Sequence, residues 1–363
     1  MKTLPSNRYL TIDENGYFVL DGLRVSDESL GQDWLSRLRI DERGRPFLSG
    51  ESDLVLIEAF DQPLIALEAS VSNTGTWHAK FPYGFERELL PDSLRVDEWD
   101  RFYARTVDGV PCVLNRHAQD SLFQQAEEYD DDSITFGTHS FPILPLFSDL
   151  AEAEQSEWWS ELYRNGETRW DNGAPHPLLD RLIPPLKIAR SRVLVLGCGA
   201  GHDAAWWEKR GHIVTGVDFS SEAIARARAL YGERDTLKWK QADAFQLPQQ
   251  WTSSFDVIFE HTMFCAITPS KRETLVRTWW RLLSPRGRLI GLVPIMDKTF
   301  GPPFGTSEWE MRKRLLDTTY RKLTATKRAL FHPLLWEREK NSSEKRKGQE
   351  LFFAVERADS STD

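Results

Sequence analysis

The stretch VLVLGCGAGHD, residues 193–203, decides the fold of this chain. An apolar run ends in three glycines at every second position, and the residues after them predict a helix. The next apolar run ends in GVDFS, residues 216–220. Glycine has no Cβ, so a ligand can approach this loop closely, and ligands of open α/β sheets bind at the carboxyl ends of the strands. We therefore predict a nucleotide site in which the carboxylate of the second motif holds two ribose hydroxyls.

Two nucleotide cofactors fit a glycine loop followed by an acid. The NAD fingerprint G-x-G-x-x-G needs its third glycine at the position of His202, whereas here that glycine comes one residue earlier. QADAF, residues 241–245, places an acid just after the following strand, where it can accept from an adenine amino group while the phenylalanine packs on the ring. We expect S-adenosylmethionine, with NAD as the alternative and a purely structural turn as the alternative to any ligand. The expected cofactor contacts are Gly197, Gly199, Gly201, Asp218, Phe219, Asp243, Ala244 and Phe245.

The chain divides into two predicted domains. Residues 1–145 show short strands of alternating apolar and polar residues separated by turns, which predicts a small β-rich α+β domain. They contain no recognisable catalytic or binding motif, so the role of this domain is unknown. Residues 150–363 alternate apolar strands with helices, which predicts an α/β, Rossmann-like, doubly wound parallel sheet. Residues 322–330 and 349–358 are expected to close that sheet as an antiparallel pair, with a mobile loop over 340–348.

Composition excludes several classes of protein. The 363 residues carry a net charge of −9, which argues against a nucleic-acid partner. The chain has no apolar run long enough for a membrane span and no signal-peptide core, so we expect a cytoplasmic protein with no membrane partner. Three scattered cysteines predict neither disulfides nor a metal site. The sequence leaves a monomer or a homodimer open.

Five blocks, in order, carry a resemblance to a known family. They are WWSELYRNGETRWDNGAPHPLL (158–179), VLVLGCGAGHD (193–203), GVDFS (216–220), FDVIFEHTMFCAITPSKR (255–272) and FGPPF (300–304). From about residue 156 to residue 358, the chain resembles the thiopurine S-methyltransferase family, including its plant halide and thiocyanate methyltransferase branch. The resemblance implies that Trp159 and Trp170 lie over S-adenosylmethionine, that the glycine loop carries its methionine part and that Asp243 and Phe245 contact adenine.

The two tryptophans suit a cofactor that carries a sulfonium cation. Indole faces attract cations, with about 0.5–2 kcal/mol for each ring when the site is desolvated. We therefore expect Trp159 and Trp170 to bind the cofactor, the alternative being that they are core residues, and we expect Trp158 to be core.

His261 is the strongest candidate for catalysis. It follows a strand end directly after Glu260, and the plant halide branch usually has Asp-Tyr at this pair. A neutral imidazole accepts protons near pH 7, so the change fits a substrate that must lose a proton; the alternative is a packed or cofactor-bonded histidine. Arg272 matches an arginine on the family's substrate side, where it would attract an anionic nucleophile or cap the pocket; a surface salt bridge is the alternative.

The residues after His261 predict a small apolar substrate pocket. Methyl transfer is an in-line displacement, in which positioning and removal of water do most of the work. The expected pocket residues are Asp171, Phe264, Cys265 and Phe304, the last carried by the stiff Gly-Pro-Pro segment at 301–303. Catalytic roles are expected for His261, Arg272 and Glu260.

Together these features predict an S-adenosylmethionine-dependent S-methyltransferase of small thiols. Hydrogen sulfide and methanethiol fit a tight apolar pocket and give volatile products such as dimethyl sulfide. The alternatives within the class are thiopurine, halide or thiocyanate methylation and methylation of selenium or tellurium species. A further alternative is a module that senses S-adenosylmethionine without catalysis.

Overall fold

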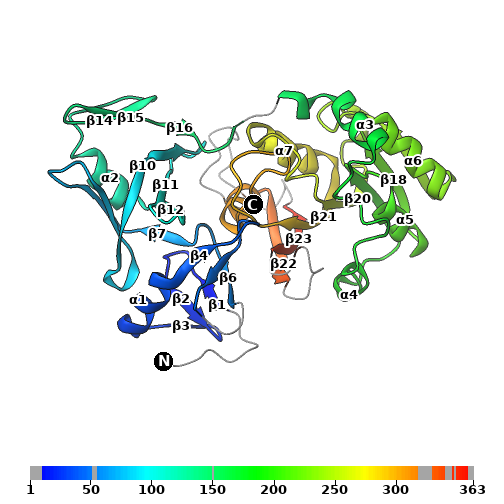
Figure 1. Ribbon diagram of the computed structural model, residues 1–363. Helices are drawn as coiled ribbons and strands as arrows, with labels where there is room; N and C mark the ends of the chain where they lie inside the picture. Colours follow the sequence, from blue (N-terminus) through cyan, green and yellow to red (C-terminus); the bar gives the residue numbers. More distant parts are fainter. Residues whose placement is uncertain are drawn as a thin grey trace. The chain divides into compact units, whose positions relative to one another are not determined.

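The structure, a computed structural model, describes residues 10–50, 55–148, 151–317, 329–339, 346 and 349–358. It separates into two compact units (Figure 1). Unit 1 comprises residues 1–148, 296–299 and 307–309, and unit 2 comprises residues 149–295, 300–306 and 310–363. The sequence does not predict that two short segments of the second half belong to the first unit.

Unit 1 is built mainly from short antiparallel strands. One sheet has the order β3-β2-β1-β6-β5-β4, a second has the order β7-β12-β11-β10-β9-β8 with β16 on β10, and a third is β13-β14-β15. The first contains β1 Leu10–Ile12, β2 Phe18–Leu20, β3 Leu23–Arg24, β4 Leu38–Ile40, β5 Pro46–Leu48 and β6 Val55–Ala59. The others contain β7 Leu64–Ala66, β8 Glu68–Val71, β9 Trp77–Lys80, β10 Glu86–Val96, β11 Phe102–Thr106, β12 Pro111–Leu114, β13 Glu128–Tyr129, β14 Ser133–Phe136, β15 His139–Pro142 and β16 Leu144–Pro145. The helices are α1 Glu28–Arg37 and α2 Arg116–Phe123.

Side-chain hydrogen bonds fix the turns of unit 1. The Asp13 carboxylate accepts from the amides of Asn15 and Tyr17 at 2.9 and 3.0 Å, and Asp41 closes the turn to β5 in the same way. An aspartate that bonds the amide two residues ahead defines an Asx turn, so these turn residues set the hairpins locally.

Unit 2 contains a seven-stranded sheet with the order β19-β18-β17-β20-β21-β23-β22. The first five strands are parallel, and β23 runs antiparallel to both of its neighbours. The strands are β17 Arg192–Leu196, β18 Ile213–Asp218, β19 Leu237–Gln241, β20 Phe255–His261, β21 Leu283–Pro294, β22 Phe331–Glu339 and β23 Glu350–Arg357. The predicted α/β doubly wound class is confirmed.

Helices cover both faces of this sheet (Figure 1). They are α3 Ser156–Asn165, α4 Leu179–Leu182, α5 His202–Lys209, α6 Ser221–Tyr231, α7 Arg272–Leu282 and α8 Glu308–Leu316. One core joins apolar residues of α4, α5 and α6 to the sheet, and the other joins those of α7 and α8 to its opposite face. Because both faces are buried, the parallel strands are almost entirely apolar, as the sequence shows.

The closing strand pair differs from its prediction. Residues 318–328 lie outside the described residues, and the partner of β23 is β22, residues 331–339. The β22 strand is at the sheet edge, contains Pro333 and has a register shift between Pro333 and Leu335. An edge strand is buried on fewer sides, so it lacks the apolar run that identifies an inner strand.

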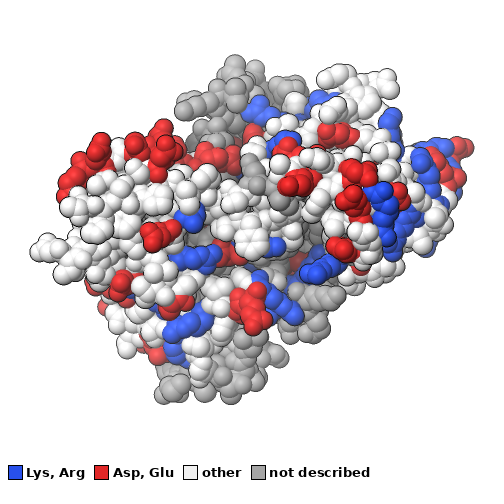
Figure 2. Space-filling model, turned by 45° about the horizontal axis from the view of Figure 1, so that its top comes forward, with Lys and Arg blue, Asp and Glu red and all other residues white. Residues whose placement is uncertain are grey.

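Of the charged side chains that the structure describes, only a minority are buried. On the face shown in Figure 2, acidic and basic side chains lie interspersed among uncharged ones. Exposed ion pairs such as Arg192–Asp256 contribute at most about 1 kcal/mol, so the fold depends on its buried apolar residues. Among the described residues, we find no helix with the length and apolar character needed to cross a membrane.

Candidate active site

The glycine loop joins β17 to α5. Gly197, Gly199 and Gly201 have φ values of 63°, 52° and 85°, a region that side chains disfavour. A Cβ on Gly199 would lie 2.8 Å from the Tyr163 hydroxyl, and one on Gly201 would lie 2.5 Å from the Trp239 ring. Only glycine fits these positions, because both the backbone angles and the space exclude a side chain.

The carboxylate of Asp218 ties this loop to the second strand. One oxygen accepts from the Gly199 amide at 2.9 Å, and the other accepts from the Ser220 amide at 3.0 Å. Each oxygen keeps a further lone pair for a ligand. Burial raises the pKa of Asp218 above its ordinary value, although the backbone amides oppose this shift. The aspartate therefore stands where the sequence predicts a ribose contact.

Four aromatic side chains gather beside the loop. Trp159 and Trp170 meet edge to face at 5.3 Å between ring centroids, and Trp158 packs on Trp159 at 5.0 Å. The Trp170 indole donates to the Tyr163 hydroxyl at 3.2 Å, and Tyr163 is the residue that approaches Gly199. Sequence reasoning did not single out Tyr163. Its position four residues after Trp159 puts both side chains on the same face of α3, and this spacing could have identified it.

Asp171 supports the segment that carries Trp170. One oxygen accepts from the Gly173 amide at 2.8 Å and lies 3.0 Å from His202 Nε2, and the other lies 3.5 Å from Arg226. His202 is the first residue of α5, so this contact links the aromatic segment to the glycine loop. The predicted place of Asp171 in the substrate pocket stays a prediction.

The predicted adenine side lies at the ends of β18 and β19. The Ala242 amide donates to the Asp218 carbonyl at 3.0 Å, which brings these ends together. Asp243 accepts from the Phe245 amide at 2.8 Å, so the acid and the aromatic ring belong to one turn. Ala244 is buried, whereas Phe219 is half-buried.

His261 is held by a carboxylate from the start of α5. Its Nδ1 lies 2.7 Å from Asp203 Oδ2, and Asp203 Oδ1 accepts from the His176 amide at 2.9 Å. Burial would raise the pKa of Asp203, but His261 and the amide outweigh it, so the pKa lies below its usual value. The ionised carboxylate places the imidazole proton on Nδ1, so the Nε2 lone pair is an acceptor, and the Arg346 guanidinium donates to it. Sequence reasoning missed Asp203, although it stands two residues after the last glycine of the loop.

A charged cluster surrounds the other side of His261. Arg346 Nη1 lies 3.3 Å from His261 Nε2 and 3.1 Å from a Glu350 oxygen, and His176 Nε2 lies 3.2 Å from the second Glu350 oxygen. His176, His261 and Glu350 offer ligand atoms within 4.8 Å of one another, a spacing that a metal ion can use. Here the guanidinium supplies the positive charge between His261 and Glu350. These residues come from separate elements, so no local pattern predicts the cluster.

Glu260 lies on the opposite face of the sheet from His261, because successive strand residues alternate. Its carboxyl accepts from the Phe264 amide at 2.9 Å, and burial raises its pKa to about 8. Glu260 therefore organises the loop after β20, and it does not share the environment of His261. Burial likewise raises the pKa of the Cys265 thiol to about 12, so this thiol stays protonated at neutral pH and is inert.

The raised pKa of Glu260 predicts a pH-dependent stability. Between pH 4.5 and 8 the folded chain keeps a proton that the unfolded chain loses, so stability falls as pH rises, by about 1.4 kcal/mol per unit. Glu260→Gln removes this titration. Urea unfolding should show that the wild type loses about 2 kcal/mol more than the variant between pH 6 and pH 8. Equal losses would contradict the shifted pKa.

Arg272 is fully buried, so the predicted alternative of a surface salt bridge is wrong. Its guanidinium donates to the Gly305 carbonyl at 2.9 Å, pairs with Glu310 at 2.9 Å and lies 4.6 Å from the Phe264 ring centroid. Burial lowers the pKa of Arg272, and Glu310 opposes that shift. Its partner stands 38 residues further along the chain, which explains why local sequence gave no sign of burial.

Arg272 also fixes residues 300–306, which we call the lip. The Phe304 amide donates to the Cys265 carbonyl at 2.7 Å, and the Phe304 ring is fully buried. The lip therefore rests on the loop that follows His261. Phe304 and Cys265, both predicted pocket residues, are brought together here.

Loss of Arg272 should destabilise unit 2. In Arg272→Met, Glu310 keeps Arg314 at 2.8 Å but loses its other partner inside the core. We expect a loss of about 3 kcal/mol, the lower end of the cost of breaking a buried ion pair. Urea unfolding measures it, and adding Glu310→Gln should restore part of the loss. A single variant as stable as the wild type would contradict this account.

The sheet order, the glycine loop after β17 and the carboxylate at the end of β18 define a Rossmann-like, S-adenosylmethionine-dependent methyltransferase. The family described as thiopurine S-methyltransferase (TPMT) matches residues 154–350. The chain belongs to this family.

Known relatives cover a similar part of the chain. Thiocyanate methyltransferase 1 of Arabidopsis thaliana is 35% identical over 186 residues, which span 49% of this chain and 80% of the relative. Probable thiol methyltransferase 2 of the same plant is 31% identical over 183 residues, 47% of this chain and 76% of the relative. Among solved structures, a 1,6-didemethyltoxoflavin-N1-methyltransferase of Burkholderia thailandensis covers 65% of this chain and 100% of its own, at 20% identity and a TM-score of 0.46.

Proposed function

We propose that the protein methylates small thiols, with hydrogen sulfide and methanethiol as substrates and volatile methylated sulfur such as dimethyl sulfide as product. The observation that carries this proposal is the Asp203–His261 pair at the carboxyl end of β20, with His261 Nδ1 2.7 Å from the carboxylate. The thiolate, not the thiol, is the nucleophile, so a protonated thiol must lose its proton before it attacks. A histidine beside the cofactor loop supplies the acceptor.

The residues of the loop suit S-adenosylmethionine. Gly197, Gly199 and Gly201 leave the backbone open, Asp218 keeps lone pairs for two hydroxyls, and Trp159 and Trp170 offer aromatic faces for a sulfonium cation. The bound cofactor supplies an electrophilic methyl group. Phe219, Asp243, Ala244 and Phe245 complete the proposed contacts.

The chain's own residues prepare the nucleophile. The thiol S–H bond breaks and its proton moves to the His261 Nε2 lone pair, which the Arg346 guanidinium gives up, while Nδ1–H keeps its hydrogen bond to Asp203. The carboxylate stabilises the imidazolium that forms. Arg346 lies 3.3 Å from Nε2, the ring atom that receives the proton, so its positive charge is close to the thiolate. Phe264, Cys265 and Phe304 exclude water, which raises the reactivity of the sulfur anion.

A second candidate function is methylation of thiocyanate or a halide. The relative named for thiocyanate favours it, and so does the Arg346 guanidinium beside His261, since a cation attracts a substrate that is already an anion. Such a substrate needs no base. Thiopurines, selenium and tellurium species remain further members of the proposed substrate class. A sensor without catalysis would not need the Asp203–His261 pair.

One assay separates these candidates. Purified protein with S-adenosylmethionine is given sulfide, methanethiol, thiocyanate, iodide or a thiopurine, and the methylated products are measured by head-space chromatography or, for the thiopurine, by absorbance. We expect the highest kcat/KM for methanethiol. Turnover of iodide or thiocyanate far above methanethiol would reverse the ranking, and cofactor binding without any turnover would favour the sensor.

We also propose that the protein works in the cytoplasm. Its three cysteines are free thiols, as is usual in a reducing compartment.

A further inference from the structure

The chain changes units on either side of the lip. Residues 296–299 belong to unit 1, the lip (300–306) belongs to unit 2, and residues 307–309 belong to unit 1 again. Both segments that flank the lip are therefore held in the fold whose role the sequence leaves open.

The first flank is fixed by a partly exposed ion pair and two backbone contacts. Asp297 Oδ2 accepts from Arg105 Nη2 at 2.6 Å, and the Thr299 carbonyl accepts from the Ser148 amide at 3.0 Å. Gly44 has a φ of 75°, and a Cβ there would lie 2.8 Å from the Asp297 carbonyl, so the flank runs directly against this turn. Side chain and backbone both fix the segment.

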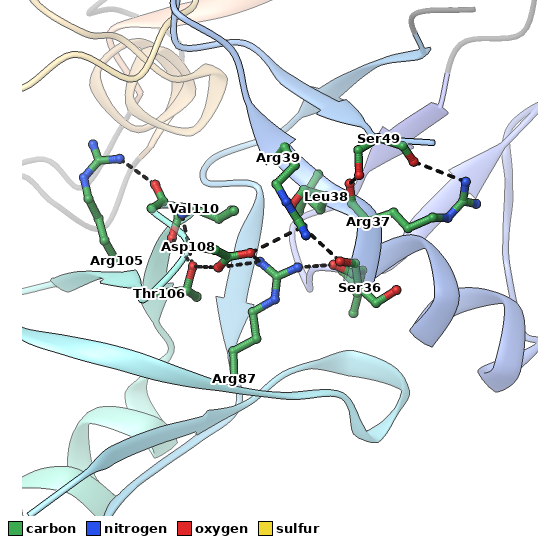
Figure 3. A network of polar contacts seen from close by, with 12 residues as sticks. Ser36, Arg37, Leu38, Arg39, Ser49, Arg87, Arg105, Thr106, Asp108 and Val110 are labelled. Carbon is green, nitrogen blue, oxygen red and sulfur yellow. Dashed lines mark hydrogen bonds and ion pairs between the residues drawn. The ribbon is translucent and has the colours of Figure 1, made fainter. Parts of the chain in front are cut away.

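Figure 3 shows what holds Arg105 in place. Its guanidinium donates to the Gly109 carbonyl at 3.0 Å, within the turn that joins β11 to β12. Asp108 in the same turn pairs with Arg87 at 3.0 Å and with Arg39 at 3.3 Å. The Arg87 side chain is only 8% exposed, whereas Asp108 and Arg39 are 32% and 40% exposed, so water reaches the outer part of this network. Arg105 is therefore presented to Asp297 from a rigid turn.

The second flank is fixed by an aromatic contact. The Trp309 amide donates to the Phe60 carbonyl at 3.0 Å, and its indole meets Trp99 edge to face at 5.1 Å. The Arg101 guanidinium lies over the Trp309 ring and pairs with Asp61 at 2.6 Å. Trp309 is also the second residue of α8, whose third residue, Glu310, pairs with Arg272.

We propose that unit 1 is a positioning module for the methyl-transfer site, because it holds both flanks of the lip and so sets the conformation of residues 300–306. The lip carries Phe304 onto the Cys265 carbonyl, three residues beyond Thr262 and four beyond His261. A short segment fixed at both ends loses its conformational freedom before the substrate binds, so less of that cost falls on binding. The inference rests on the proposed function, which makes the lip a border of the substrate site.

The test releases both flanks in the full-length protein. Asp297→Ala with Trp309→Ala is compared with the wild type and with Arg24→Ala, which removes the Arg24–Asp13 pair of unit 1 away from either flank. We expect amide hydrogen exchange of residues 300–306 to rise about tenfold, because local opening becomes easier. We also expect the KM for methanethiol to rise about tenfold while the affinity for S-adenosylhomocysteine stays within twofold, because none of the proposed cofactor contacts lies in the lip.

Hydrogen exchange in the lip and the KM for methanethiol test different parts of the inference. Unchanged exchange in the lip would overturn the inference whatever the substrate is, and this measurement needs no turnover. Faster exchange with an unchanged KM for every nucleophile would overturn the link between the lip and the site. A wild type that methylates no thiol would defeat the proposed function, and the exchange result would still stand. If the double variant unfolds, Asp297→Asn alone, which keeps the shape of the side chain, is expected to give the same changes in smaller measure.

Discussion

Replacing His261 by alanine is expected to slow methanethiol methylation about 1000-fold at pH 7, within the range attributed to general-base catalysis. The variant lacks the acceptor that Asp203 orients at 2.7 Å, so only the small fraction of thiolate already present in solution can react. Its rate should therefore rise about tenfold per pH unit while the pH stays below the pKa of the thiol, so the deficit shrinks steadily as the pH rises. Steady-state kinetics from pH 6 to pH 9 measure this profile.

Thiocyanate provides the matched substrate control. It is an anion at every pH of the series, so its turnover by His261→Ala should stay within about threefold of the wild type, the size of a packing effect. Asp203→Asn should resemble His261→Ala with the thiol, because an amide cannot stabilise the imidazolium as a carboxylate does. A thiol deficit that is independent of pH would reject His261 as the base and favour a packed histidine.

Replacing Asp218 by alanine is expected to weaken binding of S-adenosylhomocysteine about 1000-fold. The ribose hydroxyls of the ligand would lose two hydrogen bonds to the carboxylate, each worth about 1.5–3 kcal/mol because one partner is charged. The Gly199 and Ser220 amides donate to this carboxylate at 2.9 and 3.0 Å. They would also lose their acceptor, so the loop itself would loosen. Isothermal titration calorimetry measures the change directly.

Two variants make this result specific. Asp218→Asn keeps one oxygen for the loop and should show an intermediate affinity. Asp243→Ala removes an acid from the adjoining turn, where its partners are the Phe245 amide and the Gln246 side chain, and should weaken binding about tenfold through the adenine alone. Equal losses for Asp218→Ala and Asp243→Ala would contradict a special role of Asp218 in holding the ribose.

The sheet and the loop could be predicted because their signals are local. A strand buried on both faces is a continuous apolar run, and a loop that admits a ligand needs glycines at fixed spacing, so residues 193–203 and 216–220 carried the fold class and the family. The pair Trp159 and Trp170 was also visible, since both residues lie in one conspicuous block. Contacts among neighbouring residues leave a pattern in the sequence.

The rest of the site depends on contacts between distant elements. Asp203 and His261 are 58 residues apart, and Arg346 and His261 are 85 apart, so neither spacing has a sequence signature. The burial of Arg272 likewise depends on Glu310, on a different helix. The separation of Glu260 from His261 could have been predicted, because alternation along a strand puts neighbours on opposite faces, and the expectation of catalytic roles for both residues did not use it.

The antiparallel strand β23 has a consequence for how the molecule is made. It lies between β21 and β22, although it is translated after both. The ribosome therefore translates β17 to β21, with the glycine loop and Asp218, before β23 is available to join β22 to the sheet. Glu350 enters with β23, and Arg346 stands four residues before it. A nascent polypeptide of this design contains Asp203 and His261 well before it contains the charged groups that surround His261 Nε2.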